Sequence, residues 1–152
     1  MTFSQEQQEA YIRLAKEQAE ASIAAGGSPF GAVLVDENGV VVAATRNTVT
    51  PQTDILRHAE VNLLQLANEK TGKQQFPNHA IFINAASCAM CAAAVIQSGI
   101  RDIYFGAPFE SHTNPALSYE QIAPFCKQPL NINRGILEVE CTAQIARGRG
   151  VK

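Results

Sequence analysis

Apolar residues gather on one side of a helix in three stretches of the chain, which predicts amphipathic α-helices. In the first stretch, Ser4 and Gln7 are the residue pair of a capping box, and Gly26-Gly27 marks the end. A fourth stretch is rich in alanine and is followed by Gly99, a residue suited to the position after a helix. The predicted helices are Ser4–Ala25, His58–Asn68, Cys88–Gln97 and Gly135–Ala146, with a short one at Tyr119–Phe125.

Short apolar runs between these helices predict β-strands. Glu37-Asn38-Gly39 is a hairpin signal, so the strands on either side of it are expected to be antiparallel. The later strands alternate with helices, an order that leads to parallel pairing with helices on the sheet faces. The sequence therefore predicts an α/β fold, a three-layer α/β/α sandwich with a mixed sheet of about five strands. The predicted strands are Phe30–Val35, Val40–Thr45, Ala80–Asn84, Asp102–Gly106 and Leu130–Asn133, and the longer loops are Asn47–Arg57, Gly72–Asn78 and Ala107–Ser118.

Composition and charge narrow the class of protein. With 152 residues, of which 46% are hydrophobic and 17% charged, the chain is long enough for a single globular domain, 1–152. The formal net charge of −2 argues against a nucleic-acid partner, since such proteins usually carry a basic patch. The N-terminus lacks the apolar core of a signal peptide, and no apolar run is long enough to span a membrane. We therefore expect a cytoplasmic protein with no membrane partner.

Two short motifs carry the candidate chemistry, His58-Ala59-Glu60 and Cys88-Ala89-Met90-Cys91. Each is predicted at the start of a helix that follows a loop, so both can face the same end of the sheet. The positive end of a helix dipole favours thiolates, the form of cysteine that binds metal. One imidazole and two thiolates supply three ligands for Zn²⁺, and the Glu60 carboxylate can lie beside the open fourth position. Water bound at such a position ionises near neutral pH, which suits hydrolysis.

Two other interpretations of these residues remain open. A Cys-x-x-Cys pair in an α/β protein can be a thioredoxin-like redox dithiol, although such a pair has no need of His58 and Glu60 upstream. A structural zinc site would need a fourth protein ligand. The candidates for that ligand, none of which has paired spacing, are His79, His112, Cys126 and Cys141.

Beyond these motifs, most of the chain resembles the cytidine deaminase-like superfamily, in particular the branch of guanine deaminases, fungal-type cytosine deaminases and tRNA adenosine deaminases. A His-x-Glu followed by a Cys-x-x-Cys is the metal signature of such enzymes. The similar segments are Gly27–Val33 at the first strand, Asn47 after the second strand, the two metal motifs, and Gly135–Cys141 at the last helix.

The resemblance implies hydrolytic deamination with one Zn²⁺ per subunit, held by His58, Cys88 and Cys91. Glu60 would be the catalytic residue that passes a proton from water to the substrate ring and then to the leaving ammonia. The family forms dimers or tetramers, so we expect a homodimer. The residues expected to contact a small heterocyclic substrate are Phe30, Asn47, Arg57, Ala59, Ala86, Ser87, Phe109 and Asn114.

Three segments differ from the family pattern and bear on the substrate. Ala86-Ser87 replaces the usual Glu-Pro or Ser-Pro before the first cysteine, with Ser87 predicted as the N-cap of the cysteine helix. Arg57, predicted at the pocket rim, stands where relatives have alanine. Pro108–Pro124 differs from the Gly-, Ala- and Ser-rich segment of the tRNA enzymes. We expect this segment to be a lid that selects a free nucleobase, guanine- or cytosine-like.

Two alternatives to a nucleobase deaminase stay open. A tRNA adenosine deaminase is favoured by the similar last helix and by the basic residues of the C-terminal end, Arg147–Lys152, which is itself predicted to be frayed. A metal-stabilised binding module without activity is favoured by the altered Ala86-Ser87. Such a module has no use for Glu60.

Overall fold

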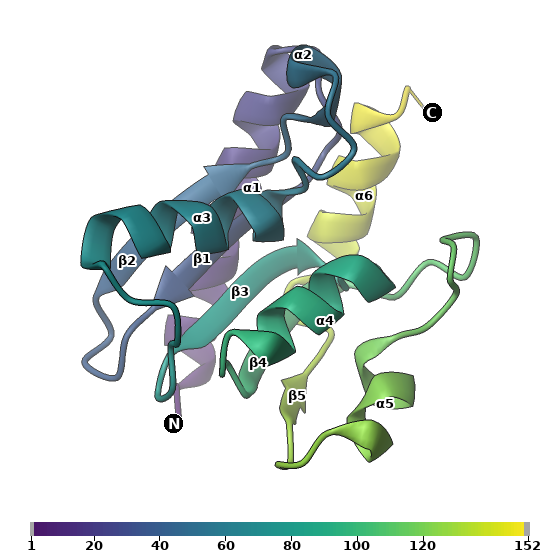
Figure 1. The fold of residues 1–152 in the computed structure, drawn as a ribbon. Helices are drawn as coiled ribbons and strands as arrows, with labels where there is room; N and C mark the ends of the chain where they lie inside the picture. Colours follow the sequence, from purple (N-terminus) through teal and green to yellow (C-terminus); the bar gives the residue numbers. More distant parts are fainter. Residues whose placement is uncertain (1, 151–152) are drawn as a thin grey trace.

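The computed structural model describes residues 2–150 and contains one five-stranded mixed sheet. Across the sheet the strands follow the order β2-β1-β3-β4-β5 (Figure 1). Each strand lies within one residue of its predicted bounds. The strands are β1 Gly31–Val35, β2 Val41–Arg46, β3 Ala80–Ala85, β4 Asp102–Ala107 and β5 Asn131–Asn133.

Helices cover both faces of the sheet and complete three layers (Figure 1). Because side chains alternate along a strand, β1 directs Ala32 and Leu34 into one core and Val33 and Val35 into the other. The predicted α/β/α sandwich is therefore confirmed. None of the helices within residues 2–150 has the length and hydropathy needed to cross a membrane. One face carries α1 (Gln5–Ala24) and α6 (Glu138–Gly148), and the other carries α3 (Ala59–Thr71), α4 (Ala89–Gln97) and α5 (Tyr119–Ile122).

The strand β1, which lies between β2 and β3, decides where the metal motifs meet. It pairs antiparallel with β2 on one side and with β3 on the other, so β2 and β3 run in the same direction. After β2 the chain passes through the short helix α2 (Val49–Gln52) into α3, and after β3 it enters α4. Both α3 and α4 therefore begin at the same edge of the sheet, beyond the carboxyl ends of two strands. Ligands of α/β proteins commonly bind at such an edge.

Local sequence signals are confirmed at three boundaries. Ser4 and Gln7 form the predicted capping box of α1, with Gln7 N–H donating to Ser4 Oγ (3.1 Å) and Ser4 N–H donating to Gln7 Oε1 (2.8 Å). Gly39, in the turn of the β1–β2 hairpin, has a φ of 78°, and Gly99, just after α4, has a φ of 84°. Glycine reaches such positive φ angles at little cost, which is why it marks these turns.

The predictions for residues 47–57 and for the start of the last helix are wrong. The predicted loop at residues 47–57 contains α2, whose first turn accommodates Pro51 without loss of a helical hydrogen bond. The last helix begins at Glu138 rather than at Gly135. Gly135 and Leu137 have φ angles of 77° and 53°, which lie outside the α-helical region.

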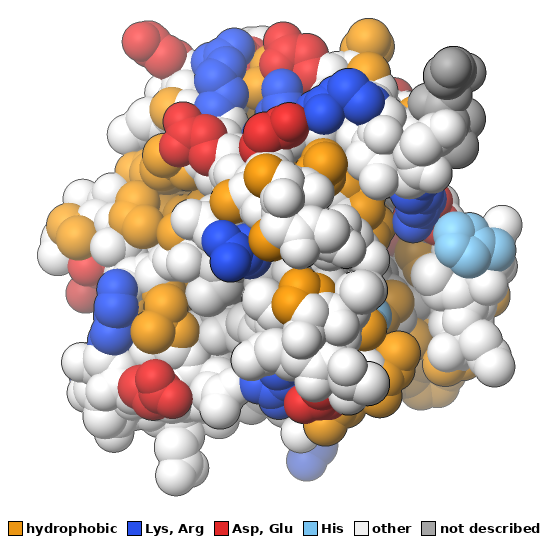
Figure 2. All heavy atoms as spheres, turned by 90° about the horizontal axis from the view of Figure 1, so that it is seen from above, with side chains coloured by type: hydrophobic (Ala, Val, Ile, Leu, Met, Phe, Trp, Pro, Cys, Tyr) orange, Lys and Arg blue, Asp and Glu red, His pale blue; other side chains and the backbone are white. Residues whose placement is uncertain are grey.

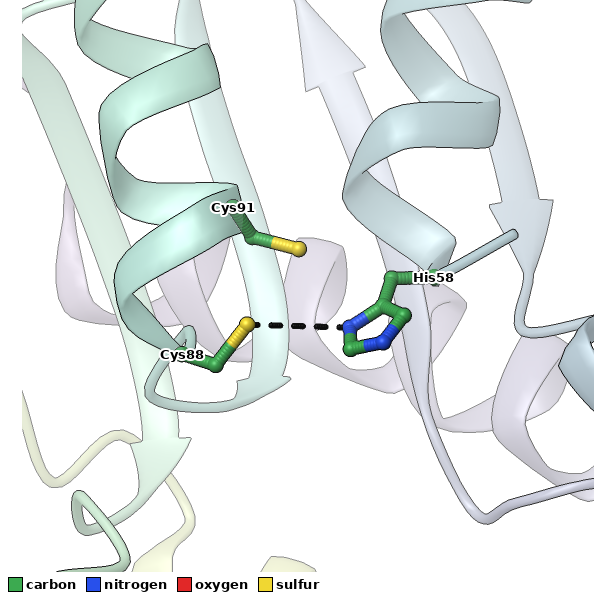
Figure 3. A group of neighbouring side chains, drawn as sticks. All are labelled: His58, Cys88 and Cys91. Atoms are coloured by element: carbon green, nitrogen blue, oxygen red, sulfur yellow. Dashed lines mark hydrogen bonds between the residues drawn. The ribbon is translucent and has the colours of Figure 1, made fainter. Parts of the chain in front are cut away.

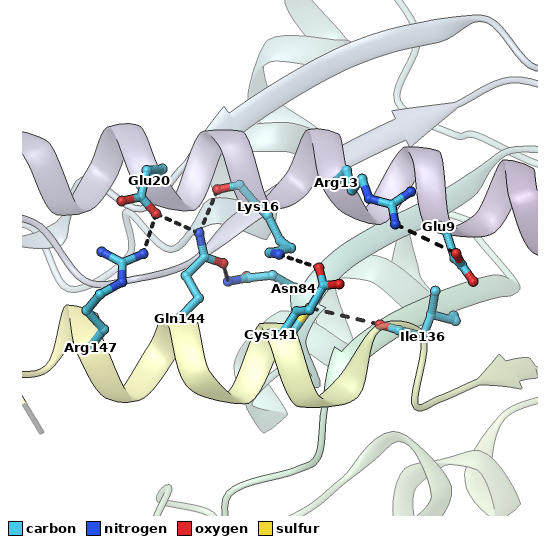
Figure 4. A network of polar contacts seen from close by, with 10 residues as sticks. Glu9, Arg13, Lys16, Glu20, Asn84, Ile136, Cys141, Gln144 and Arg147 are labelled. Carbon is cyan, nitrogen blue, oxygen red and sulfur yellow. Dashed lines mark hydrogen bonds and ion pairs between the residues drawn. The ribbon is translucent and has the colours of Figure 1, made fainter. Parts of the chain in front are cut away.

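As far as Gly148, the C-terminal end is helical and tied to α1 rather than frayed. Arg147 donates to the carboxylate of Glu20 on α1 (2.7 Å), and α6 continues to Gly148 (Figure 4). Gln144, buried between the two helices, donates to the Lys16 carbonyl (2.8 Å) and to Glu20 (3.0 Å). Residues 151–152 of the predicted frayed end lie outside the described residues.

Candidate active site

Three potential metal ligands meet where α3 and α4 begin. His58 is the N-cap residue of α3 and Cys88 is that of α4, while Cys91 lies in the first turn of α4 and is fully buried. Neither His58 nor Cys88 uses its side chain to cap its helix, which is the usual role of a polar side chain at that position. The imidazole and both thiols point into the space between the two helices instead (Figure 3).

The separations of these donor atoms fit a zinc ion. Cys88 Sγ lies 3.7 Å from His58 Nδ1, and one donor atom from each of the three residues lies within 4.8 Å of the other two. In a tetrahedral site with ordinary Zn–S and Zn–N bonds, sulfur and nitrogen ligand atoms are about 3.6 Å apart. In the described part of the chain, no other group of three His, Cys, Asp or Glu side chains is arranged to hold a metal. The proposed fourth ligands, His79, His112, Cys126 and Cys141, are not part of the group.

Hydrogen bonds among the donors separate their pKa values. Cys91 and His58 both bond to Cys88, and these bonds lower the pKa of the Cys88 thiol to about 4. The same contact with Cys88 raises the pKa of His58, and with burial it raises that of Cys91. Cys88 is therefore a thiolate at neutral pH, whereas Cys91 releases its proton when it coordinates a metal. Metal binding at this site is coupled to proton release.

Glu60 lies in the first turn of α3 and is only 6% exposed. Burial raises the pKa of its carboxyl, and a hydrogen bond from the Ser87 hydroxyl opposes that rise. The Ser87 hydroxyl is also 2.9 Å from the phenol oxygen of Tyr119. The prediction that Ser87 caps the cysteine helix is therefore wrong. Cys88 takes the cap position, and Ser87 faces Glu60 and Tyr119.

A pocket of about 270 Å³ opens beside the donors. Small-molecule sites of proteins begin at about this size, roughly 300 Å³. The Asn47 side chain is fixed in the wall because its amide oxygen accepts a hydrogen bond from Val49 N–H (3.0 Å). The predicted site residues that line the pocket are Phe30, Asn47, His58, Glu60, Ala86, Ser87, Cys88 and Phe109.

Three predicted substrate contacts, Arg57, Ala59 and Asn114, do not line this pocket. Arg57 lines a separate surface depression, where its guanidinium contacts the Asp54 carboxylate (3.1 Å) and the side-chain oxygen of Gln65. Ala59 is fully buried. Asn114 follows the pocket-lining Thr113 but is itself exposed.

The pocket contains an ion pair that the sequence does not indicate, between Arg149 and Glu110. Arg149 binds Glu110 through two hydrogen bonds, one of them 2.9 Å long, and lowers the pKa of that carboxyl. The Arg149 guanidinium also lies over the Phe30 ring, 5.5 Å from its centroid. Glu110 falls within the predicted lid, but no local pattern connects it to an arginine 39 residues further on. The other pocket residues not predicted from sequence are Ser28, Val49, Ile55, Ala85, His112 and Thr113.

Comparisons with known proteins agree with this fold and site. A family model for the cytidine and deoxycytidylate deaminase zinc-binding region matches residues 5–107. A tRNA-specific adenosine deaminase of Agrobacterium fabrum is 31% identical over 121 residues, 78% of each chain. A probable cytosine deaminase of Schizosaccharomyces pombe is 32% identical over 102 residues, 67% of this chain and 61% of that protein. The structure of a guanine deaminase from Nitrosomonas europaea covers 93% of this chain and 84% of its own, with a TM-score of 0.81 and 25% identity.

A mixed α/β/α sandwich with three zinc donors and a buried carboxylate at one edge of its sheet defines a zinc-dependent hydrolase. The match over residues 5–107 is more specific: the chain belongs to the cytidine and deoxycytidylate deaminase family. Its relatives carry the names of three different substrates, a tRNA adenosine, cytosine and guanine. Membership therefore defines deamination as the reaction type without defining the substrate.

Proposed function

We propose that the protein deaminates a free nucleobase or a related amino-heterocycle, guanine- or cytosine-like, with release of ammonia. The observation that carries this proposal is the pocket, which is small and offers the rings of Phe30 and Phe109 beside the zinc donors. Among the described residues that line it, Arg149 is the only Lys or Arg, and it is paired with Glu110. An uncharged ring suits such a pocket, whereas polynucleotide phosphates are held by available basic side chains.

In the proposed reaction, His58, Cys88 and Cys91 would hold a zinc ion, which would supply Lewis-acid activation of a water molecule. Glu60 accepts a proton from that water and delivers it to a ring nitrogen. Glu60 then takes the remaining proton from the hydroxyl group that has bonded to the ring carbon and passes it to the amino group as the carbon–nitrogen bond breaks. A carbon–oxygen bond replaces the carbon–nitrogen bond, and ammonia leaves.

The pocket walls orient the ring for this attack. Phe30 and Phe109 provide flat apolar surface on which a heterocycle can stack. The Asn47 amide is available to one polar edge of the ring. The backbone at Ala86 is held by its N–H donating to the Ala107 carbonyl (2.9 Å), so its own carbonyl can accept a hydrogen bond from the substrate amino group.

The test is ammonia release by zinc-loaded protein from guanine, cytosine, isocytosine and adenine. At least one ring is expected to be deaminated. Glu60→Gln is expected to keep its zinc and to lose roughly 10²- to 10⁴-fold in turnover, the usual contribution of general acid–base catalysis. Failure to turn over any small ring would contradict the proposed substrate class, and an active Glu60→Gln variant would contradict the mechanism.

A tRNA adenosine deaminase is the second candidate, supported by the similarity to the Agrobacterium fabrum enzyme. Against it, Arg147 and Arg149 are paired with Glu20 and Glu110. Figure 2 shows acidic and basic side chains interspersed on the face that carries α2 and the C-terminal end, without one continuous basic patch. Inosine formation in an anticodon stem-loop would support this candidate. Absence of RNA binding at low salt, where electrostatic affinity is greatest, would exclude it.

We also propose that the chain forms a homodimer through the apolar side chains beside the pocket. Ile55 lines the pocket and yet is 72% exposed, and the neighbouring Leu56 is also exposed. Light scattering is expected to give twice the 16.4 kDa mass of one chain. Ile55→Ser is expected to weaken the dimer, whereas Val139→Ser, at an even more exposed position on α6, leaves it intact. A monomeric mass for the wild-type protein would refute the proposal.

A further inference from the structure

We propose that Tyr119 is a positioning residue for the reaction, because through Ser87 it holds the carboxylate of Glu60 in place at the pocket. This inference rests on the proposed function, in which Glu60 carries the proton. It assigns a role to the lid segment that is separate from contact with the substrate.

The three side chains lie next to one another. The phenol oxygen of Tyr119 is 2.9 Å from Ser87 Oγ, and the Ser87 hydroxyl faces the Glu60 carboxyl in the pocket wall closely enough to lower its pKa. All three residues are buried, with Tyr119 and Ser87 only 1% exposed. Bulk water therefore does not compete for these bonds, and losing one of them leaves a buried polar group without its partner.

The direction of each hydrogen bond follows from the groups involved. In the proposed reaction Glu60 starts as an ionised carboxylate, which can only accept, so the Ser87 hydroxyl donates its single proton to Glu60. The Ser87 oxygen is then left with lone pairs only, and the Tyr119 phenol must donate to it. The Tyr119 hydroxyl thus orients the Ser87 hydroxyl toward Glu60. Without that phenol, Ser87 Oγ loses the donor that holds its rotamer.

Tyr119 is itself held firmly by the lid and the sheet. It is the first residue of α5, whose N-cap Ser118 forms a capping box with Gln121, with Ser118 N–H donating to Gln121 Oε1 (2.9 Å). Its ring stacks on Phe105 of β4 at a centroid separation of 6.3 Å and an interplanar angle of 17°. Because the ring is fixed, the phenol hydroxyl is held beside Ser87. The position of α5 therefore affects the position of the Glu60 carboxylate.

The arrangement is specific to the residues of this chain. The related enzymes usually have proline at the position of Ser87, and proline has no hydroxyl to place between a tyrosine and the carboxylate. The hydroxyl that Ser87 provides in place of proline contacts Tyr119, which lies in the segment that differs from that of the tRNA enzymes.

Kinetics of Tyr119→Phe test the inference, because this change removes the hydroxyl and keeps the ring. The expected result is a kcat reduced roughly threefold to tenfold with KM unchanged, the loss of one hydrogen bond. Ser87→Ala is expected to lower kcat at least as much and to make a further Tyr119→Phe change silent. Zinc content per chain is expected to stay the same in all variants. Unchanged kcat in Tyr119→Phe, or additive effects of the two changes, would overturn the inference.

Tyr11→Phe is the matched control for a merely structural role. The Tyr11 hydroxyl donates to the Gly39 carbonyl (2.6 Å), in the hairpin turn and outside the pocket. Its loss is expected to lower the melting temperature and to leave kcat of the folded enzyme unchanged. If Tyr119→Phe behaves in the same way, Tyr119 only stabilises the fold.

A second measurement needs no substrate. The chain has three tyrosines, so ¹³Cζ-labelled tyrosine gives a simple NMR spectrum in which Tyr119→Phe identifies one signal. In zinc-loaded protein, Glu60→Gln and Ser87→Ala are each expected to shift the Tyr119 signal and to leave the Tyr11 signal in place. If the enzyme is active but neither change shifts the Tyr119 signal, the role of Tyr119 is refuted and the proposed function stands. A responsive signal in a protein that deaminates nothing refutes the proposed function and leaves the contact to Glu60 intact.

Discussion

His58 and Cys88 stand at positions where a short oxygen-bearing side chain would normally bond to the first backbone N–H groups of a helix. Their side chains face each other instead, and Cys91 joins them from the first turn of α4. At the scale of single residues, the site is thus a set of donors whose positions are fixed by helix starts. The contact between His58 Nδ1 and Cys88 Sγ joins the two helix starts directly.

Removing one donor is expected to empty the site of metal. Cys91→Ser replaces a thiolate ligand by a hydroxyl that stays protonated at neutral pH, so zinc per chain is expected to fall from about one to near zero. Atomic absorption on desalted protein measures it. Cys126→Ser is the control, because this thiol contacts the Ile122 carbonyl and is not part of the donor group. Full zinc occupancy in Cys91→Ser would show that the donors are wrongly assigned.

The Glu110–Arg149 pair predicts a dependence of stability on pH. Hydrogen bonds from Arg149 lower the pKa of Glu110 below the usual 4.5, so the stabilisation is complete above that pH and is lost as the pH falls through the lowered pKa. Both side chains are about one-third exposed, so the effect stays below about 1 kcal/mol. In metal-free protein, Glu110→Gln is expected to lower the melting temperature at pH 7 and to lower it less at pH 3, which is below the ordinary pKa of 4.5. Glu17→Gln, on the exposed side of α1, is the control. An equal loss at both pH values would rule out the ion pair as the cause.

The metal donors were predictable because a fixed spacing at two helix starts constrains where those side chains lie. Asn47 and Phe30 were predicted from the family resemblance and do line the pocket. Arg57 was not predictable in the same way. Its direction is set by Asp54 and Gln65, which draw the guanidinium away from the pocket.

At the scale of elements, a buried amide links α6, α1 and β3. The Gln144 amide donates to Lys16 and Glu20 of α1, and its oxygen accepts from Asn84 of β3 (3.2 Å) (Figure 4). Asn84 in turn accepts from Gly31 N–H (3.1 Å), at the start of β1. One side chain of α6 therefore stabilises the start of β1.

Gln144→Ala is expected to destabilise the protein by about 1–3 kcal/mol, because Asn84 and the Lys16 carbonyl lose their buried partner. Urea unfolding monitored by circular dichroism measures the change. Val139→Ala, at an 84% exposed position of the same helix, is expected to have little effect. Equal stabilities of Gln144→Ala and Val139→Ala would mean that α6 is held by its apolar contacts alone.

Strands were more predictable than helix ends. The strands β1 and β3 are buried along their whole length, and such strands appear in sequence as continuous apolar runs with sharp limits. The start of α6 depends on the backbone angles of Gly135 and Leu137, and an unfavourable angle at a leucine leaves no sequence signal. The short α2 has too few residues for any periodicity.

At the scale of the whole molecule, the zinc donors join two helices that are separated along the chain by β3. A metal that binds only the folded protein stabilises it by mass action, about 4 kcal/mol at a free concentration 1,000 times the dissociation constant. Chelation is therefore expected to lower the melting temperature by roughly 10 °C for a chain of this size. Scanning calorimetry with and without chelator measures the shift. Cys91→Ser should melt at the same temperature in both conditions, and a chelator effect of equal size in that variant would point to another metal site.

The fold class could be predicted from the sequence, but the contacts between distant segments could not. The alternation of strands and helices after one hairpin was enough for a mixed three-layer sandwich, and β1 between two antiparallel neighbours places both motifs at one edge. The contact between Glu110 and Arg149 and the one between Ser87 and Tyr119 each join distant segments. Such contacts depend on how the loops pack against the folded sheet, which local sequence patterns do not specify.

At the N-cap positions of α3 and α4, His58 and Cys88 serve metal binding instead of capping, so the residues best suited to metal binding are not those that make the metal-free fold most stable. A Ser, Asn or Asp at either position would cap its helix and add about 1 kcal/mol to the stability of the metal-free chain, while it would remove a donor. Variants selected for heat resistance in zinc-depleted medium would therefore accumulate changes at these two positions. The most thermostable metal-free form of this fold would be one that has lost its chemistry.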